Sequence, residues 1–259
     1  MSSAVRTSFL SEIYKKLFQE FGAQHWWPAE TSFEVIVGAI LTQNTNWGNV
    51  EKALNNLRRA KVLELSALHK LSEGKLAQLI KPAGYFNVKA KRLKNVISFL
   101  YKEYDGDLGK ARDESLDRLR LKLLAINGVG PETADSILLY AFEKPSFVVD
   151  SYTKRIFYRH GIINSRDEYK DVRGLFMDQL KHDTGMFNEY HALIVRLAKD
   201  FCRKTAPRCE SCPLREISYS LSLKCFQCHK VLLPQEEKKK AKTSLGFSQK
   251  YLCLECLDS

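Results

Sequence analysis

Residues Leu123 to Arg155 have the sequence LLAINGVGPETADSILLYAFEKPSFVVDSYTKR and decide the fold that we expect. Apolar residues at helical spacing end at Ile126, and Asn127-Gly128-Val129-Gly130-Pro131 then interrupts the pattern. Glycine adopts positive φ easily and proline lacks an N–H, so neither favours continuing a helix. Proline suits the first turn of a following helix, and apolar residues at helical spacing resume through Phe142. The stretch therefore predicts a helix, a tight glycine turn and a second helix.

The turn and the acid that follows it each have a plain and a functional interpretation. Free backbone N–H groups at Gly128 and Gly130 would bind a phosphate without reading sequence, whereas an ordinary helix-turn-helix corner needs no ligand. Asp150 follows the apolar run FVV and precedes a helical segment, so it is a good helix N-cap and also a carboxylate delivered to a half-dry site. Capping and catalysis can coexist. Together the two features suggest chemistry on DNA.

Three further motifs precede the hairpin in a characteristic order. They are HWWP at 25–28, FEVIVGAILTQNTNW at 33–47 and AGYFNVKAKRL at 83–93. With the hairpin and VVDSYTKR, they make the chain resemble the helix-hairpin-helix DNA glycosylases, the endonuclease III superfamily, over roughly residues 5 to 217. The resemblance implies an all-α, two-lobed glycosylase domain over residues 1–217. It also implies a base excision repair enzyme acting on double-stranded DNA that carries a damaged base.

Two positions indicate which branches of the family the chain does not resemble. Bifunctional members carry a lysine nucleophile just after the hairpin, where this chain has Glu132, so a Schiff base with the sugar is not available at that site. The adenine-removing branch carries a glutamate shortly before its QQT motif, where this chain has Ala39. The chain looks most like the 3-methyladenine DNA glycosylase III branch, whose members are monofunctional and remove alkylated purines.

Three other functions remain as alternatives. The first is a glycosylase for uracil or mismatched thymine, and the second is a bifunctional glycosylase/lyase of the endonuclease III type. The third is a non-catalytic binder of damaged DNA. Asp150 separates the last from the others, because a pure binder has no need of that carboxylate.

The resemblance also implies roles for individual residues. Asp150 would stabilise positive charge at the sugar or activate water. The base pocket is expected to include Glu132 and the three tryptophans, because aromatic faces attract a cationic base; core packing is the alternative for any tryptophan. These tryptophans are Trp26, Trp27 and Trp47.

Contacts to DNA are expected from the hairpin and from several polar side chains. In the family, the turn that holds Gln43 and Asn44 supplies residues that wedge into the gap left by a flipped base; a plain Asn/Thr turn is the alternative. The basic side chains that follow GYFN, and those that follow Asp150, could bind phosphate. For those after GYFN, the alternative is a helix face exposed to solvent. The residues expected to contact DNA are Gln43, Asn44, Gly128, Gly130, Lys89, Lys91, Lys154 and Arg155.

All seven cysteines lie late in the chain, and their spacing suggests metal rather than disulfides. Residues 202–218 resemble the iron–sulfur loop of the family, with Cys202, Cys209 and Cys212, but Ser218 stands where the fourth cysteine is usual. Residues 219–259 carry two CxxC knuckles with the Cys₄ spacing of a zinc ribbon. The ligands of that expected module are Cys225, Cys228, Cys253 and Cys256.

Seven cysteines can divide between a [4Fe–4S] cluster and zinc in two ways. In one, zinc takes the four late cysteines, and the first three hold a cluster with Ser218 or another ligand, or hold nothing. In the other, Cys225 completes the cluster and His229 joins the three remaining cysteines on zinc. The symmetry of the knuckles favours the first division, and the ligand count favours the second. In either case we expect iron near Cys202 and a metal that is structural.

Composition and periodicity agree with this interpretation. The chain has 259 residues and a net charge of +11, which suits a polyanionic partner. The sequence has no apolar run long enough for a membrane span, and its start suggests an amphipathic helix, not a signal peptide. We expect a cytoplasmic, nucleoid-associated monomer. Helical periodicity predicts helices over residues 6–21, 31–42, 47–59, 73–80, 87–103, 114–126, 132–142, 151–159, 167–181 and 187–201.

Overall fold

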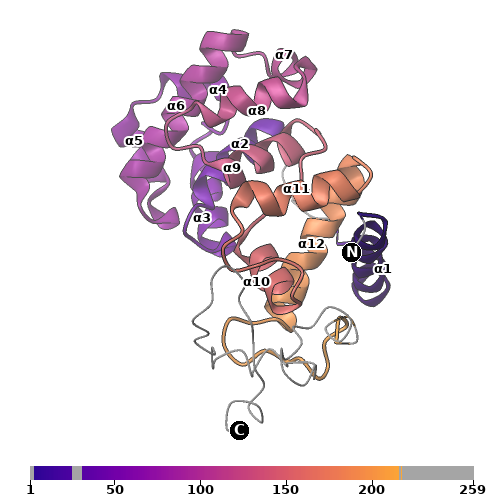
Figure 1. The fold of residues 1–259 in the computed structure, drawn as a ribbon. Coiled ribbons are helices and arrows are strands. Elements are labelled where there is room, and N and C mark those ends of the chain that lie inside the picture. The colour runs from indigo at the N-terminus through magenta and orange to yellow at the C-terminus, as the bar shows by residue number, and fades with distance from the viewer. Residues whose placement is uncertain (1–2, 25–30, 216, 218–259) are drawn as a thin grey trace, which may run out of the picture. The chain divides into compact units, whose positions relative to one another are not determined.

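The computed structural model of the protein describes residues 3–24, 31–215 and 217 (Figure 1). These residues form helices, turns and loops, without a strand among them. The all-α class predicted from the sequence is therefore confirmed for the described residues. The helices are α1 (Ser3–Phe21), α2 (Ser32–Leu41), α3 (Trp47–Arg59), α4 (Leu65–Lys70), α5 (Glu73–Leu79), η1 (Lys81–Ala83), α6 (Phe86–Tyr104), α7 (Leu108–Asp113), α8 (Leu116–Leu124), α9 (Pro131–Ser136), η2 (Ile137–Ala141), α10 (Ser151–Arg159), α11 (Tyr169–Gln179) and α12 (Thr184–Asp200).

Each of the ten predicted helical segments overlaps a helix of the structure, with ends that differ by up to three residues when α9 and η2 are taken together. The short helices α4, η1 and α7 were not predicted, and η2 continues α9 as a π-helical turn. Among the described helices, none combines the length and apolar character needed to cross a membrane.

The chain divides into two compact units, each made from separate stretches of sequence. Unit 1 contains the described residues of Met1–Gln24, Val149–Leu180 and Tyr190–Ser259. Unit 2 contains those of His25–Val148 and Lys181–Glu189. The N-terminal helix α1 thus joins the late helices α10, α11 and α12, and it packs against α11.

Unit 2 is built around helix α2, whose residues from Phe33 to Leu41 are all buried. A helix that is apolar on every face belongs in a core, and α2 packs against α3, α6, α9 and η2. Its start is fixed by Thr31, whose Oγ1 accepts a hydrogen bond from the Glu34 N–H at 3.1 Å. Glu34 is itself buried and pairs with Arg58 of α3. The core helix therefore begins at a defined residue, which fixes where the turn after Leu41 emerges.

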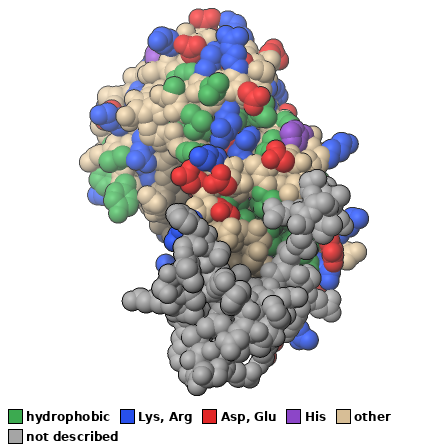
Figure 2. All heavy atoms as spheres, in the orientation of Figure 1, with side chains coloured by type: hydrophobic (Ala, Val, Ile, Leu, Met, Phe, Trp, Pro, Cys, Tyr) green, Lys and Arg blue, Asp and Glu red, His purple; other side chains and the backbone are tan. Residues whose placement is uncertain are grey.

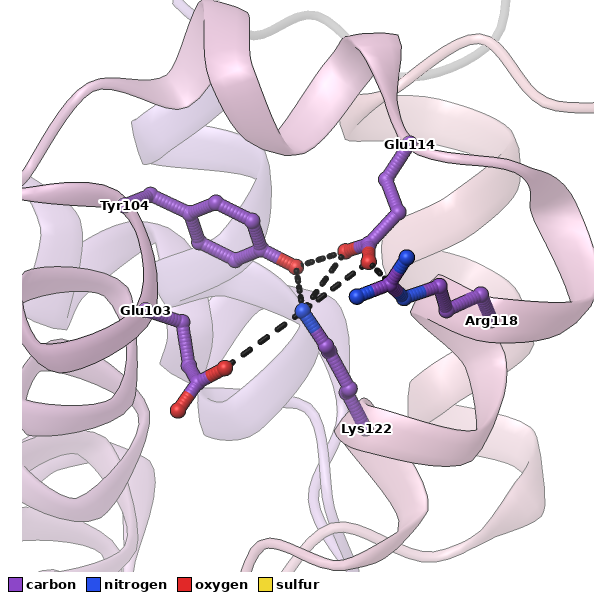
Figure 3. Close-up of polar contacts among 5 residues, drawn as sticks. All are labelled: Glu103, Tyr104, Glu114, Arg118 and Lys122. Atoms are coloured by element: carbon purple, nitrogen blue, oxygen red, sulfur yellow. Dashed lines mark hydrogen bonds and ion pairs between the residues drawn. The ribbon is translucent and has the colours of Figure 1, made fainter.

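A polar cluster joins the end of α6 to α8 in the same unit (Figure 3). The Tyr104 hydroxyl donates to Glu114, and the Lys122 ammonium lies 2.9 Å from Glu114 and 3.4 Å from Glu103. Arg118 adds a second cation 2.7 Å from Glu114. Burial, followed by the hydrogen bond to Glu114, raises the pKa of Tyr104 to about 12. The cluster holds α8 in place, and the hairpin follows directly from α8.

Unit 1 is organised by helix α12, which is buried at nearly every position from Tyr190 to Ala198. The Tyr190 hydroxyl donates to the Leu10 carbonyl of α1 at 3.0 Å. The centre of its ring lies 5.3 Å from the centre of the Tyr14 ring. Burial raises the pKa of Tyr190 well above its ordinary value. This contact ties the first and last helices of the described chain together.

Candidate functional site

The glycine hairpin joins α8 to α9 and is shaped by two different glycines. Gly128 has φ +96°, which lies in the left-handed region that favours glycine. A Cβ placed on Gly128 would lie 2.3 Å from Cγ of Arg92, so the α6 side chain packs directly against the missing methyl position. Gly130 has φ −92° and is the N-cap of α9, with Pro131 at the first helical position. Only Gly128 is required to be glycine for steric reasons.

A side-chain network holds this hairpin against the core helix α2. Gln43, in the turn after α2, donates from Nε2 to the Gly128 carbonyl at 3.1 Å and to Thr133 Oγ1 at 3.0 Å. Arg92 in turn donates to Oε1 of Gln43 at 2.5 Å. Two motifs that are far apart in sequence, LTQNT and GVGPETAD, are thus bonded to each other.

Two carbonyls of the hairpin accept side-chain hydrogen bonds, while its glycine N–H groups are available. The Asn127 carbonyl accepts from Nδ2 of Asn95 at 2.9 Å, and the Gly128 carbonyl accepts from Gln43. In the described part of the chain, the N–H groups of Gly128 and Gly130 donate to no backbone carbonyl. Available backbone donors beside a helix start are suited to an anion.

The helix that follows the hairpin is anchored by a buried ion pair. Asp135 is fully buried, and its two oxygens lie 2.8 and 3.1 Å from Nε and Nη2 of Arg120 in α8. Ser146 donates to the same carboxylate at 2.6 Å. Bidentate pairing of this kind adds geometric specificity to the charge interaction, and here it links α8 to α9 across the glycines.

In unit 1, Asp150 caps helix α10. Its Oδ1 accepts from the Thr153 N–H at 2.7 Å and from the Thr153 hydroxyl at 2.9 Å. Its Oδ2 faces Nε2 of His191, from α12, at 3.5 Å. The predicted N-cap is therefore confirmed.

The surroundings of Asp150 keep it ionised. Burial works to raise the pKa of Asp150, but the proximity of His191 and the two Thr153 hydrogen bonds together outweigh it and lower that pKa. A carboxylate that accepts several hydrogen bonds is stabilised in its charged form. Asp150 is thus a partly dry, negatively charged group at neutral pH.

Comparison with known proteins assigns the chain to a family. Residues 37–182, which include both the hairpin and Asp150, match the family model described as "HhH-GPD superfamily base excision DNA repair protein". The chain belongs to the HhH-GPD superfamily. It is 52% identical over 210 residues to a Methanocaldococcus jannaschii protein provisionally named a DNA repair glycosylase, covering 81% of this chain and 95% of that one.

Solved structures give the same result for the fold. The 3-methyladenine DNA glycosylase of H. pylori bound to 1,N6-ethenoadenine is 28% identical, with a TM-score of 0.63 over 77% of this chain and 98% of that one. An endonuclease III–DNA complex is 21% identical, with a TM-score of 0.70 over 84% of this chain and 95% of the other, and supports the fold alone. The family model and the 52% identical relative make this HhH-GPD protein a member of the DNA glycosylase family of base excision repair.

Lys89 of this HhH-GPD protein occupies a different place from the one we expected. Its ammonium is buried and donates to the carbonyls of Leu41 at 2.9 Å and Ala83 at 2.7 Å, at the ends of α2 and η1. Burial, followed by the charge of Arg92, lowers the pKa of Lys89. A buried ammonium committed to two helix ends cannot reach a phosphate, so the expected DNA contact at Lys89 is corrected to a structural role. Its neighbour Lys91 is exposed.

The remaining expected DNA contacts are placed as follows. Asn44 is exposed with φ +53°, whereas the Gln43 side chain is engaged with the hairpin. Lys154 donates to the Asp167 carbonyl at 3.3 Å. Arg155 donates to the Cys202 carbonyl at 2.9 Å, and its guanidinium lies 5.1 Å from the centre of the Tyr152 ring.

The residues expected in the base pocket differ in how exposed they are, and two of them lie outside the described part of the chain. Trp47 is half-buried and packs against the unit 2 core at the start of α3. Glu132 is exposed in the first turn of α9. Trp26 and Trp27 lie outside the described residues.

The cysteine loop is described only in its first part. Cys202 is buried, and Arg159 of α10 donates to its sulfur at 3.3 Å. Burial raises the pKa of Cys212 to about 11. Within residues 3–24, 31–215 and 217, no group of three or more ligating side chains is arranged to hold a metal ion, and the metal centre at Cys202, Cys209 and Cys212 stays an expectation. Ser218, His229 and the four late cysteines lie outside the described residues.

Three residues near these features were not assigned a functional role from the sequence. Thr153 stands three residues after Asp150, a spacing that signals a helix cap and could have identified it. His191 meets Asp150 only through the packing of α12, which no local pattern reveals. Tyr85 is 73% exposed with φ +46°, just before α6, and an aromatic directly after a glycine, where the helical pattern is interrupted, was the available signal.

Proposed function

We propose that this protein is a monofunctional DNA glycosylase that removes alkylated purines such as 3-methyladenine. The proposal is carried by Asp150, a partly buried carboxylate held in its ionised form by Thr153 and His191. A relative that is 28% identical, a 3-methyladenine DNA glycosylase bound to 1,N6-ethenoadenine, supports the choice of substrate.

The charge state of Asp150 favours a base that is already cationic. An ionised carboxylate has no proton to give to a leaving group, but it stabilises positive charge that develops on the sugar. In an N-alkylated purine the glycosidic electron pair leaves with the base and cancels the positive charge of the ring. Water then bonds to C1′ and loses a proton, which leaves an abasic sugar and the free base. A neutral base such as uracil would gain less from this arrangement.

The absence of an amine beside the hairpin supports a hydrolytic rather than a lyase reaction. Glu132, in the slot of the lysine nucleophile, is an exposed carboxylate in the first turn of α9. A carboxylate forms no Schiff base with C1′. Ala39, in the slot of the adenine-removing glutamate, is buried in α2 among apolar residues.

For DNA binding we propose a surface on unit 2 around the hairpin. It combines the N–H groups of Gly128 and Gly130 with the exposed side chains of Lys91, Asn44 and Tyr85. Backbone donors and a lysine suit phosphates, and an exposed aromatic suits stacking on bases. Net charge alone does not mark this surface, because Lys and Arg lie across the face drawn in Figure 2 with Asp and Glu among them.

The deciding experiment is base release from duplex DNA treated with a methylating agent, comparing wild type with Asp150→Asn. Asparagine caps a helix about as well as aspartate, so this variant removes the charge and keeps the fold. We expect wild type to release 3-methyladenine and to leave strands intact until alkali is added. The variant should be slower by about 100-fold or more.

Other outcomes would redirect the assignment. If wild type releases no methylated base, the substrate proposal is wrong, and uracil and thymine mismatches are the next substrates to test. A covalent adduct trapped by borohydride would instead indicate a lyase and contradict the monofunctional proposal.

The metal content stays a prediction with its own measurement. Iron and zinc analysis of protein purified with and without oxygen, together with a visible spectrum, tests both divisions of the cysteines. Iron absent under both conditions would exclude the cluster.

A further inference from the structure

The carboxylate of Asp150 is approached from a second helix by His191. Nε2 of His191 lies 3.5 Å from Oδ2 of Asp150, and the two side chains are 8% and 13% exposed. We propose that His191 is a positioning residue that fixes the plane of the Asp150 carboxylate by donating from Nε2 to Oδ2. The inference rests on the proposed function, in which Asp150 stabilises charge at the sugar.

Thr153 restrains the carboxylate of Asp150 from one side only. Both of its donors bind Oδ1, and the last torsion of an aspartate side chain is broad rather than sharply staggered. A donor on the other oxygen narrows the range of that torsion further. Among the described residues, the side chain that faces Oδ2 is His191. The two donors, on opposite oxygens, determine where the negative charge points.

His191 is itself held in place, as a positioning residue must be. Its neighbour Tyr190 is fully buried and donates to the Leu10 carbonyl at 3.0 Å. The Tyr190 ring also packs at 5.3 Å from Tyr14 and 5.8 Å from Phe176. These contacts prevent α12 from turning about its axis, so the next residue presents its imidazole to Asp150 at a constant position.

Side chains from three helices lie at Asp150 or at the residue before it. The imidazole of His191 is the titratable group that faces its carboxylate. Thr153 faces the carboxylate from α10, and His191 faces it from α12. From α11, the Tyr169 hydroxyl accepts a hydrogen bond from the Val149 N–H at 3.4 Å, one residue before Asp150. A distance of 3.5 Å is long for a hydrogen bond, and catalytic hydrogen bonds are often long before substrate binds.

Three variants separate positioning from simple packing. His191→Phe keeps an aromatic ring and removes the donor, whereas His191→Gln keeps an N–H near the same point. His160→Phe is the matched control, because His160 is another buried histidine of unit 1, at the opposite end of α10. Single-turnover excision should fall about 10- to 100-fold in His191→Phe, recover largely in His191→Gln and stay within about 2-fold in His160→Phe. The affinity for DNA with an abasic-site analogue should be unchanged in all three.

A second measurement does not depend on activity. In protein with ¹³C-labelled aspartate carboxyls, the Asp150 signal is identified by its loss in Asp150→Asn. Its titration midpoint should rise in His191→Phe and return towards wild type in His191→Gln. An unchanged excision rate in His191→Phe, or a midpoint that does not move, overturns the inference. If wild type excises no base from any tested DNA but the midpoint still moves, the proposed function fails and the positioning of Asp150 by His191 stands.

Discussion

Replacing Gly128 with alanine tests how the hairpin is built, and its cost can be worked out from two features. The residue has φ +96°, and left-handed backbone costs a non-glycine residue about 1–2 kcal/mol. The new Cβ would also lie 2.3 Å from Cγ and 2.8 Å from Cδ of Arg92. Arg92 cannot simply swing away, because its guanidinium is bonded to Gln43. Overpacking of this kind costs about 1–3 kcal/mol.

Alanine also restricts the unfolded chain, which offsets about 0.4–1 kcal/mol of that cost. The net loss in free energy of unfolding is therefore about 2–4 kcal/mol, and at about 2–4 °C per kcal/mol the Tm should fall by roughly 5–15 °C. Thermal and urea unfolding followed by circular dichroism would measure both quantities on the purified full chain.

Gly130→Ala is the matched control for this prediction. Gly130 has φ −92°, and no heavy atom of the described residues lies within 4 Å of its Cβ position. Its replacement should cost about 1 kcal/mol or less. Equal losses in the two variants would refute the reasoning. So would a Gly128→Ala loss that Arg92→Ala fails to reduce in the double variant, because removing the clashing atoms must relieve the strain.

Further expectations concern buried polar groups. Asp135→Ala leaves Arg120 without its buried partner and should lower the free energy of unfolding by about 3–5 kcal/mol in urea. Burial lowers the pKa of His160 from 6.5 to about 4, so the unfolded chain takes up that proton first; up to about 3 kcal/mol of stability present above pH 6.5 should be lost as pH falls towards 4. His160→Phe should flatten that part of the stability–pH curve. Lys89→Met should cost about 1–3 kcal/mol without weakening DNA binding, whereas Lys91→Met should weaken binding and change stability by about 0.5 kcal/mol or less.

The helices were predictable where local chemistry was strong. The run FEVIVGAIL predicted α2 because a segment that is apolar at every position but Glu34 must be buried, and Asp150 predicted the start of α10 because its side chain can cap it. The short helices α4 and α7 have six residues each, which is less than two turns. So short a segment offers little periodicity, and its helix is stabilised mainly by packing against neighbours.

The site was predictable in its backbone elements and less so in its side chains. Lys89 and Lys91 are indistinguishable by type, yet one is buried and the other exposed. Helical spacing indicates that Lys89 is the buried one, because it lies four residues before Leu93 and seven before Val96, on the apolar face of α6. The contact between Asp150 and His191 had no such signal, because it depends on how α12 is anchored by residues of α1 and α11. A local sequence pattern does not predict a side-chain contact that depends on how distant helices pack.

Asp150 serves both as a helix cap and as the proposed charge-stabilising group, and the two roles use different oxygens. Oδ1 accepts both donors from Thr153, whereas Oδ2 faces His191 and retains a lone pair. An asparagine can keep the first set of contacts, because its carbonyl oxygen accepts as a carboxylate oxygen does. It cannot supply the negative charge, and its amide would turn an N–H towards His191. A loss of excision in Asp150→Asn with an unchanged Tm would therefore be a loss of charge and not of the helix.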